Sequence, residues 1–269
     1  MSRLASNDVP RREQDGDIVV DAIVEASAFQ DFITVIRGVV AESRIHFNDD
    51  GLHARAVDPG NVAMTDVRLG TDAFESYDAG AVTVGVNLTR LDDELDFANQ
   101  GDLVRIRVDM ETRKLKLDVG EHVKPTIGLI DPDSIRQEPD HPDLDLPNKA
   151  ILSPDRIGTA LDAVENVTDH VRIAWDGENE VFLFHGQGDI DDTRIEYGLD
   201  ALEGGSHFDE ETASLYSHGY LEDIHGAIPS STDVVKIVFG DEHPTKWHYE
   251  AQDGSLSVTT MCAPRIQSK

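Results

Sequence analysis

Hydrophobic positions near the start of the chain change from a strand-like spacing to a helix-like spacing and back. Residues 17–25 are rich in Ile and Val, and apolar side chains then recur at the i, i+3, i+4 and i+7 positions of a helix. These helix positions are Phe29, Phe32, Ile33 and Ile36. Three strand-like runs follow between residues 44 and 69, with an Asp-Asp-Gly hairpin turn after the first. The order predicts a β-α-β-β-β unit in which Ser27 is the helix N-cap.

The same order recurs three more times. Helical runs begin after Asn87, Ser153 and Ser217, which are residue types that cap helices, and Pro154 suits the first helical position. Each of the four caps lies about 18 residues before the next strand-like run. Four units with one spacing indicate an internal repeat.

A segment rich in proline and aspartate, residues 131–147, divides the four units into two pairs. Such a segment cannot lie inside a helix or a sheet, so it predicts an exposed connecting loop. We expect a disordered tail at 1–16, an N-terminal domain at 17–130 and a C-terminal domain at 148–269. Each domain is a pair of β-α-β-β-β units, which makes the fold class α+β, with the helices on one face and antiparallel sheet on the other.

Charge is the main feature of the composition. The chain has 53 Asp and Glu against 23 Lys and Arg, a net charge of −30 that is spread over its whole length. We interpret this as an acidic, solvated surface for work in molar salt, where the Debye length is about 3 Å. A basic partner and broad cation binding are the alternatives. The pattern contains no basic stripe for nucleic acid and no membrane-binding patch.

Compartment and chemistry follow from what the sequence lacks. It has no run of 18 apolar residues and no secretory signal, and its one cysteine, Cys262, is expected to be a buried, inert thiol, so we expect a cytoplasmic protein. It has no HExxH, GxSxG, P-loop or GxGxxG motif. Acid clusters at 140–145 and 189–192 are expected to be solvated loops. The sequence therefore predicts no enzyme and no metal site, with no cofactor beyond bound Na⁺ or K⁺ counterions.

Four motifs resemble the archaeal-type DNA polymerase sliding clamps, the PCNA family. They are AVDPGNVAM (56–64), VGVNLTRL (84–91), LIDPDSIRQEPD (129–140) and CAPRI (262–266), and the resemblance runs from about residue 17 to the end. With the acidic composition, it indicates a clamp from a salt-adapted organism. The resemblance implies a two-domain DNA clamp that encircles duplex DNA as a homotrimeric ring. Such a ring is a processivity factor, placed by a clamp loader, that tethers DNA polymerase and other replication and repair enzymes.

The resemblance also implies where partners bind. Short apolar peptide motifs of partner enzymes would dock in a groove beside the connector. Its matching residues are Val57, Val62, Ile135, Pro139, Pro244, Met261, Cys262, Ala263 and Pro264. Trimer contacts would pair an edge strand near 114–119 with 193–199 of a neighbour. The residues expected there are Lys114, Leu115, Leu117, Arg194, Ile195 and Tyr197.

The helices that would face DNA depart from the family pattern. Clamps of this family place Lys and Arg there, whereas the matching positions here are mostly acidic or neutral: Gln30, Asp31, Asp93, Asp96, Thr159, Asp162 and His225. Arg37 keeps its charge, and Arg90 and Arg156 lie on the same helices. Each lost cation removes one phosphate contact. We hypothesise that hydrated cations bridge aspartates and phosphates.

Two other functions fit the same composition. On the first alternative the chain would be an acidic interaction or cation-binding scaffold. On the second it would be a clamp paralogue that serves as one subunit of a hetero-oligomer and does not encircle DNA by itself. The mass of the assembly in high salt separates these readings from a homotrimer.

Overall fold

The computed structural model describes residues 17–140, 142 and 144–265. The part before the connector contains nine strands and two helices. They are β1 (Ile18–Glu25), α1 (Ala26–Arg37), β2 (Glu42–Asn48), β3 (Gly51–Val57), β4 (Ala63–Gly70), β5 (Phe74–Ala79), β6 (Val82–Asn87), α2 (Leu88–Leu95), β7 (Leu103–Asp109), β8 (Lys114–Val119) and β9 (Thr126–Gly128). The connector contains one short 3-10 turn, Pro132–Ser134.

The part after the connector repeats this arrangement. Its elements are β10 (Asn148–Leu152), α3 (Pro154–Glu165), β11 (His170–Asp176), β12 (Val181–Gln187), β13 (Asp192–Gly198), β14 (His207–Phe208), β15 (Thr212–Ser217), α4 (His218–Gly226), β16 (Val235–Phe239), β17 (Thr245–Ala251) and β18 (Leu256–Cys262). The described residues thus contain four helices among antiparallel strands, which confirms the α+β fold class.

A nine-stranded sheet crosses the middle of the molecule. Its order is β14-β10-β16-β17-β18-β4-β3-β2-β6, so it takes strands from both sides of the connector. The two sides join where β18 pairs antiparallel with β4 over seven register pairs, from Leu256↔Leu69 to Cys262↔Ala63. Two smaller sheets, β5-β1-β7-β8-β9 and β13-β12-β11-β15, form the two ends.

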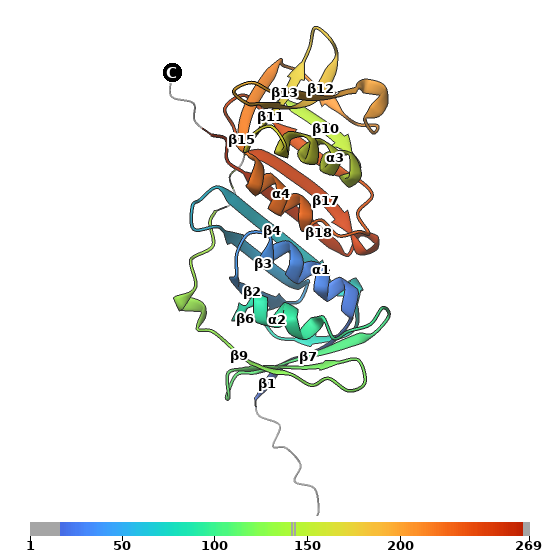
Figure 1. Cartoon of the computed structure of the whole chain (residues 1–269). Helices are drawn as coiled ribbons and strands as arrows, with labels where there is room; N and C mark the ends of the chain where they lie inside the picture. Colours follow the sequence, from blue (N-terminus) through green and yellow to red (C-terminus); the bar gives the residue numbers. More distant parts are fainter. Residues whose placement is uncertain (1–16, 141, 143, 266–269) are drawn as a thin grey trace, which may run out of the picture.

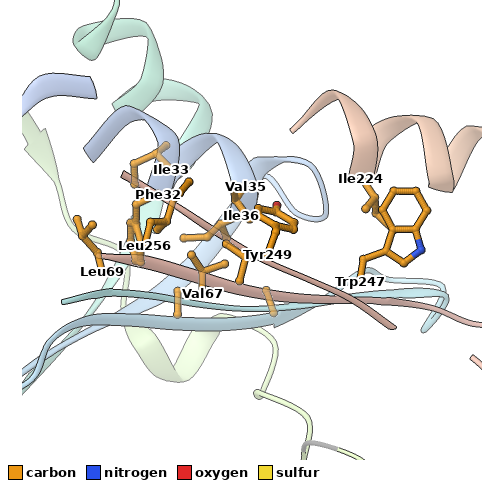
Figure 2. Packing of buried hydrophobic residues seen from close by; sticks show 14 of the residues in the cluster. Phe32, Ile33, Val35, Ile36, Val67, Leu69, Ile224, Trp247, Tyr249 and Leu256 are labelled. Atoms are coloured by element: carbon orange, nitrogen blue, oxygen red, sulfur yellow. The ribbon is translucent and has the colours of Figure 1, made fainter. Parts of the chain in front are cut away.

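The four helices cover one face of the sheets (Figure 1). Phe32, Ile33 and Ile36 of α1 are fully buried, as their spacing predicts. They pack on Val67 and Leu69 of β4 and also on Tyr249 and Leu256 of β17 and β18, so one helix covers strands from both sides of the connector (Figure 2). Ile224 of α4 lies over Trp247 in the same layer (Figure 2). Burying each such side chain stabilises the fold by about 1.5–3 kcal/mol.

The four predicted helix caps were only partly correct. Asn87 caps α2 as expected, because its side chain accepts the N–H of Arg90. Ser27 is not a cap: α1 begins one residue earlier, and the Ser27 hydroxyl donates to Glu25. Ser153 and Ser217 occupy the N-cap positions of α3 and α4 without a capping hydrogen bond from the side chain.

Two strands were missed. β5 has the sequence FESYDA, in which acids interrupt the apolar run, and it lies at the edge of its sheet beside β1. β14 has only two residues, His207 and Phe208, and the Phe208 ring stacks on Trp175 at a centroid distance of 3.8 Å. Short or polar edge strands give little local signal, because only one neighbour stabilises them.

Candidate partner-binding surface and channel face

An apolar row crosses the sheet on the face turned away from the helices. Val67 faces α1 in Figure 2, so Met64, three residues earlier on the same strand, faces the opposite side. Met64 pairs with Val57 on β3 and with Met261 on β18, and Lys246 of β17 continues the row. Val57 and Met261 therefore lie together as predicted. Met64 was missed, although the alternation of apolar and polar residues in its strand was the available signal.

The turn that carries Val62 is held by one carboxylate. Asp58 accepts the N–H groups of Gly60, Val62 and Ala63 at 2.6–2.8 Å, and it accepts the Tyr220 hydroxyl of α4 at 2.9 Å. Burial would raise the pKa of Asp58, but these donors outweigh it and lower the pKa. The Val62 carbonyl in turn accepts the N–H of Ala263 at 2.7 Å. The structure thus brings Val62 next to the C-terminal segment, as predicted.

The C-terminal motif divides between the two faces of the sheet. Cys262 is 1% exposed and follows Met261, so its side chain points toward the helix layer and lies in the core. Burial raises the pKa of its thiol to about 12. Pro244, Ala263 and Pro264 are half-buried. Pro264 borders a hollow of ≈ 290 Å³ that is also lined by Arg172, Leu215 and Arg265.

Ile135 does not join the apolar row. Its side chain lies on Gly85 of β6, where an added Cβ would come within 2.7 Å of Ile135 Cδ1. β6 is four strands from β18 in the sheet, which is about 19 Å at a strand spacing of about 4.8 Å. Pro139 lies nearer, because its carbonyl accepts Arg55 of β3 at 3.4 Å. The connector residue beside the apolar row is Leu144, whose carbonyl accepts a hydrogen bond from Lys246.

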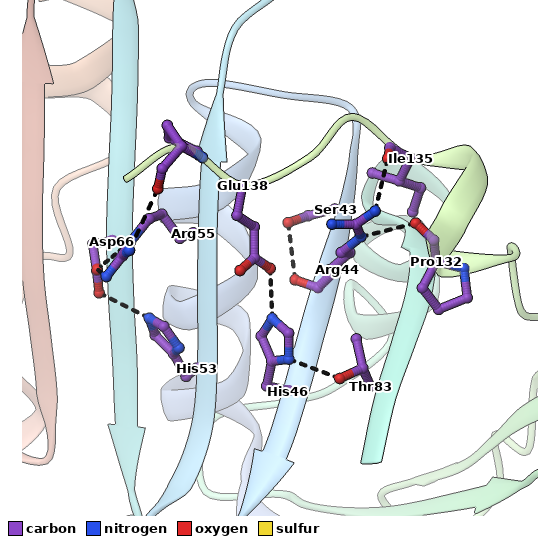
Figure 3. A network of polar contacts seen from close by, with 11 residues as sticks. Ser43, Arg44, His46, His53, Arg55, Asp66, Thr83, Pro132, Ile135 and Glu138 are labelled. Atoms are coloured by element: carbon purple, nitrogen blue, oxygen red, sulfur yellow. Dashed lines mark hydrogen bonds and ion pairs between the residues drawn. The ribbon is translucent and has the colours of Figure 1, made fainter. Parts of the chain in front are cut away.

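A buried polar cluster lies under the connector (Figure 3). Asp66 is 8% exposed and accepts Arg55 Nε at 2.6 Å and pairs with His53 Nε2 at 3.0 Å. Burial alone would raise the pKa of Asp66. The hydrogen bonds and charges of His53 and Arg55 outweigh burial and hold the pKa well below its ordinary value. The carboxylate therefore stays ionised across the neutral and mildly acidic range.

This cluster predicts a specific acid sensitivity. The pKa of Asp66 is lowered by folding, so its contribution to stability is complete above its unfolded pKa of about 3.9 and is lost as the pH falls toward the folded value. We expect Asp66→Asn to be less stable at pH 7 and to lose less stability than the wild type below about pH 4. Urea midpoints across a pH series in constant molar KCl measure this. Parallel pH curves for the two proteins would contradict it.

The candidate channel face contains few free cations. Arg37 of α1 pairs with Asp92 of α2. Arg90 and Arg156 are exposed. His225 Nε2 lies 2.9 Å from the Pro154 carbonyl, so this ring connects α4 to α3.

Two of the acid or neutral channel positions have partners of their own. Gln30 donates to the Leu95 carbonyl, and Asp31 accepts Gln252 at 2.6 Å. Burial raises the pKa of Asp31.

Of the two strands predicted to form trimer contacts, one lies at the edge of its sheet and the other does not. β13 ends its sheet, and it carries Arg194, Ile195 and Tyr197. The prediction that 114–119 is an edge strand was wrong, because β9 pairs with β8 and takes the edge position. Lys114 is exposed, but Leu115 and Leu117 are buried in the core.

Within the described ranges, no three His, Cys, Asp or Glu side chains form a group able to hold a metal ion. The same part of the chain contains no helix long and apolar enough to cross a membrane.

A solved structure supports the fold. The structure titled "C-terminal region of FEN-1 bound to A. fulgidus PCNA" superposes with a TM-score of 0.84 at 32% identity, over 93% of this chain and 100% of the other. A family model described as the proliferating cell nuclear antigen N-terminal domain matches residues 20–128. The helix layer and the sheets are therefore those of a DNA clamp.

Curated relatives identify the family. The DNA polymerase sliding clamp of Halobacterium salinarum is 42% identical over 251 residues, which are 92% of this chain and 98% of the relative. That of Haloarcula marismortui is 41% identical over 253 residues, 93% and 99% of the two chains. The chain belongs to the PCNA family and is a DNA polymerase sliding clamp. Its relatives from halophilic archaea agree with the salt-adapted composition.

Proposed function

We propose that three copies of this chain form a ring that a clamp loader closes around duplex DNA, and that the ring itself has no catalytic activity. It would hold DNA polymerase and other replication and repair enzymes through their short apolar peptides. The observation that carries the proposal is the pair of edge strands, β9 and β13, at opposite ends of a molecule whose helices share one face (Figure 1). Head-to-tail pairing of such edges generates rings when the rotation closes.

The charges at the two ends of the molecule support head-to-tail pairing of β9 with β13. Residues 101–128, which include β9, contain six Lys and Arg against five Asp and Glu. Residues 176–203, which include β13, contain one Arg against nine Asp and Glu. Contact between these two unlike ends is therefore less repulsive than contact between two copies of the acidic end.

The helix face favours topological rather than adhesive binding of DNA. The four helices carry nine Asp and Glu and three Arg. Such a surface gives little counterion release on contact with phosphates. A closed ring retains DNA without affinity, and hydrated Na⁺ or K⁺ between carboxylates and phosphates would offset the repulsion.

The partner surface supports the tethering role. Val57, Met64 and Met261 form an apolar row on an otherwise acidic chain, next to the connector. The relative from A. fulgidus was solved with the C-terminal region of FEN-1 bound, which supports a peptide partner for this chain too. An apolar row beside an extended segment suits the recognition of a short peptide with apolar anchors.

Retention on circular DNA tests the proposal. The chain is loaded in molar KCl onto a nicked circle with the clamp loader of Halobacterium salinarum, and bound protein is measured before and after the circle is cut once. We expect retention on the circle and release after cutting, together with longer products from that organism's polymerase on a primed circle. Equal retention on circular and cut DNA would contradict encirclement. A monomer in molar KCl would instead favour a hetero-oligomer subunit.

A further inference from the structure

The connector is held to the sheet by cations that bind its main-chain oxygens. Arg44 of β2 donates to the carbonyls of Pro132 at 2.8 Å and Ile135 at 3.1 Å (Figure 3). Arg55 of β3 donates to the Pro139 carbonyl at 3.4 Å. The connector therefore crosses β2 and β3 on the face opposite the helices, over cations that belong to the sheet.

Lys246 of β17 makes the last of these contacts. Its Nζ donates to the carbonyls of Pro142 and Leu144, both at 3.3 Å. Three strands thus hold successive parts of the connector, and the cation nearest the C-terminal segment holds the part nearest the apolar row.

The burial of Lys246 makes its contact with the connector important. The residue is 7% exposed, and lysine is almost never this buried without a partner. Lys246 also pairs in register with Met261, so its ammonium group lies beside the apolar row. If the connector moved away, this ammonium would lose two acceptors and the row would lose its neighbouring wall.

Carbonyl acceptors suit a chain that works in salt. The connector carries many carboxylates, yet these three cations bind its backbone. A hydrogen bond to a carbonyl does not depend on which side chain the connector carries, and it is short-ranged. It is therefore less sensitive to salt than attraction between separated surface charges. Side-chain contacts of the connector accompany them. His46 Nε2 lies 2.5 Å from Glu138 Oε1, and Arg136 of the connector donates to the Asp58 carbonyl at 2.9 Å and to Asn61 Oδ1.

We propose that Lys246, assisted by Arg44 and Arg55, is a positioning residue that fixes the connector as one wall of the partner-peptide groove. This inference rests on the proposed function of the groove. The cations do not touch the peptide. They hold the connector in place before a partner arrives, so that binding does not have to order it.

Lys246→Met tests the inference, because methionine keeps an unbranched apolar stem and removes the donors. The probe is a synthetic peptide with the sequence of the A. fulgidus FEN-1 C-terminal region. We expect the Kd to rise about tenfold, as for the loss of a charged hydrogen bond, with unchanged trimer mass in molar KCl. Amide hydrogen exchange of residues 136–140 and 144–146 should speed up in the free ring.

Two further variants make the comparison specific. Lys236→Met is the matched control, because Lys236 lies one strand away on β16, pairs with His248 and is half-buried on the same face. Lys236→Met should change neither the Kd of the peptide nor the amide hydrogen exchange of the connector. Arg44→Met should speed exchange at residues 132–135 and affect peptide binding less, because Ile135 lies over β6, two strands beyond Val57 at the end of the row, whereas Lys246 lies beside Met261.

The outcomes separate the two proposals. Unchanged affinity and unchanged exchange in Lys246→Met, with a wild-type ring that binds the peptide, would overturn the positioning role. Equal losses in Lys246→Met and Lys236→Met would also overturn it, because any lysine on this face would then suffice. If the wild-type ring does not bind the peptide, both the proposed peptide groove and the role of the connector as its wall are contradicted. The exchange data still report whether Lys246 holds the connector.

Discussion

In molar KCl the chain is expected to have the mass of a trimer, and near 0.1 M KCl it is expected to dissociate. Three chains with a net charge of −30 each give a ring with a net charge of −90. At about 1 M salt the Debye length is about 3 Å, so neighbouring carboxylates are screened from one another. At about 0.1 M it is about 10 Å, and repulsion acts across the contact between two chains. Light scattering across a KCl series measures the change.

Sugars provide the control for this salt effect. Sucrose also favours compact states by exclusion from the protein surface, but it does not screen charge. Sucrose at 0.1 M KCl should therefore fail to restore the trimer. A trimer that persists unchanged from 0.1 M to molar KCl would contradict the role of charge.

Thr126→Pro is expected to give a monomer that remains folded in molar KCl. Leu117 N–H donates to the Pro125 carbonyl, and Leu129 N–H donates to the Arg113 carbonyl, so residues 125 and 129 bond toward β8. Backbone groups alternate in direction along an antiparallel strand, so the N–H of Thr126 points to the free edge. Proline removes that donor and is tolerated on edge strands, so it blocks pairing with β13 of a neighbour and leaves the β8–β9 pairing intact.

Thr126→Val is the matched variant, because it removes the hydroxyl and keeps the backbone donor. It should remain a trimer. Scattering mass and circular dichroism, measured together on both variants, distinguish loss of assembly from loss of fold. A trimer for Thr126→Pro would show that β9 is not the assembly edge.

Helices were the most predictable part of the fold. The spacing of Phe29, Phe32, Ile33 and Ile36 is a local signal, and the buried side of α1 follows it. The cap at Asn87 was equally local. The prediction of Ser27 as the N-cap was wrong, because the helix already begins at Ala26. A serine near a helix start is common and does not by itself fix the first helical residue.

Strand order was the least predictable part. β9 (Thr126–Gly128) is the edge strand beside β8, but nothing local in its sequence says that it lies outside β8. The path of the connector is similar: Ile135 and Leu144 are both apolar, and only the sheet order places one over β6 and the other near β17. Cys262 and Met261 differ because alternation sends them to opposite faces, and the sequence alone contained that information.

The pairing of β18 with β4 gives the connector an unusual freedom to evolve. Seven register pairs and a shared core under α1 join the two sides of the molecule. The covalent link is therefore not needed to keep them together, and a chain cut within the connector should remain one particle. Insertions and substitutions there carry little penalty for folding, so partner preference can diverge between related clamps while their architecture stays the same.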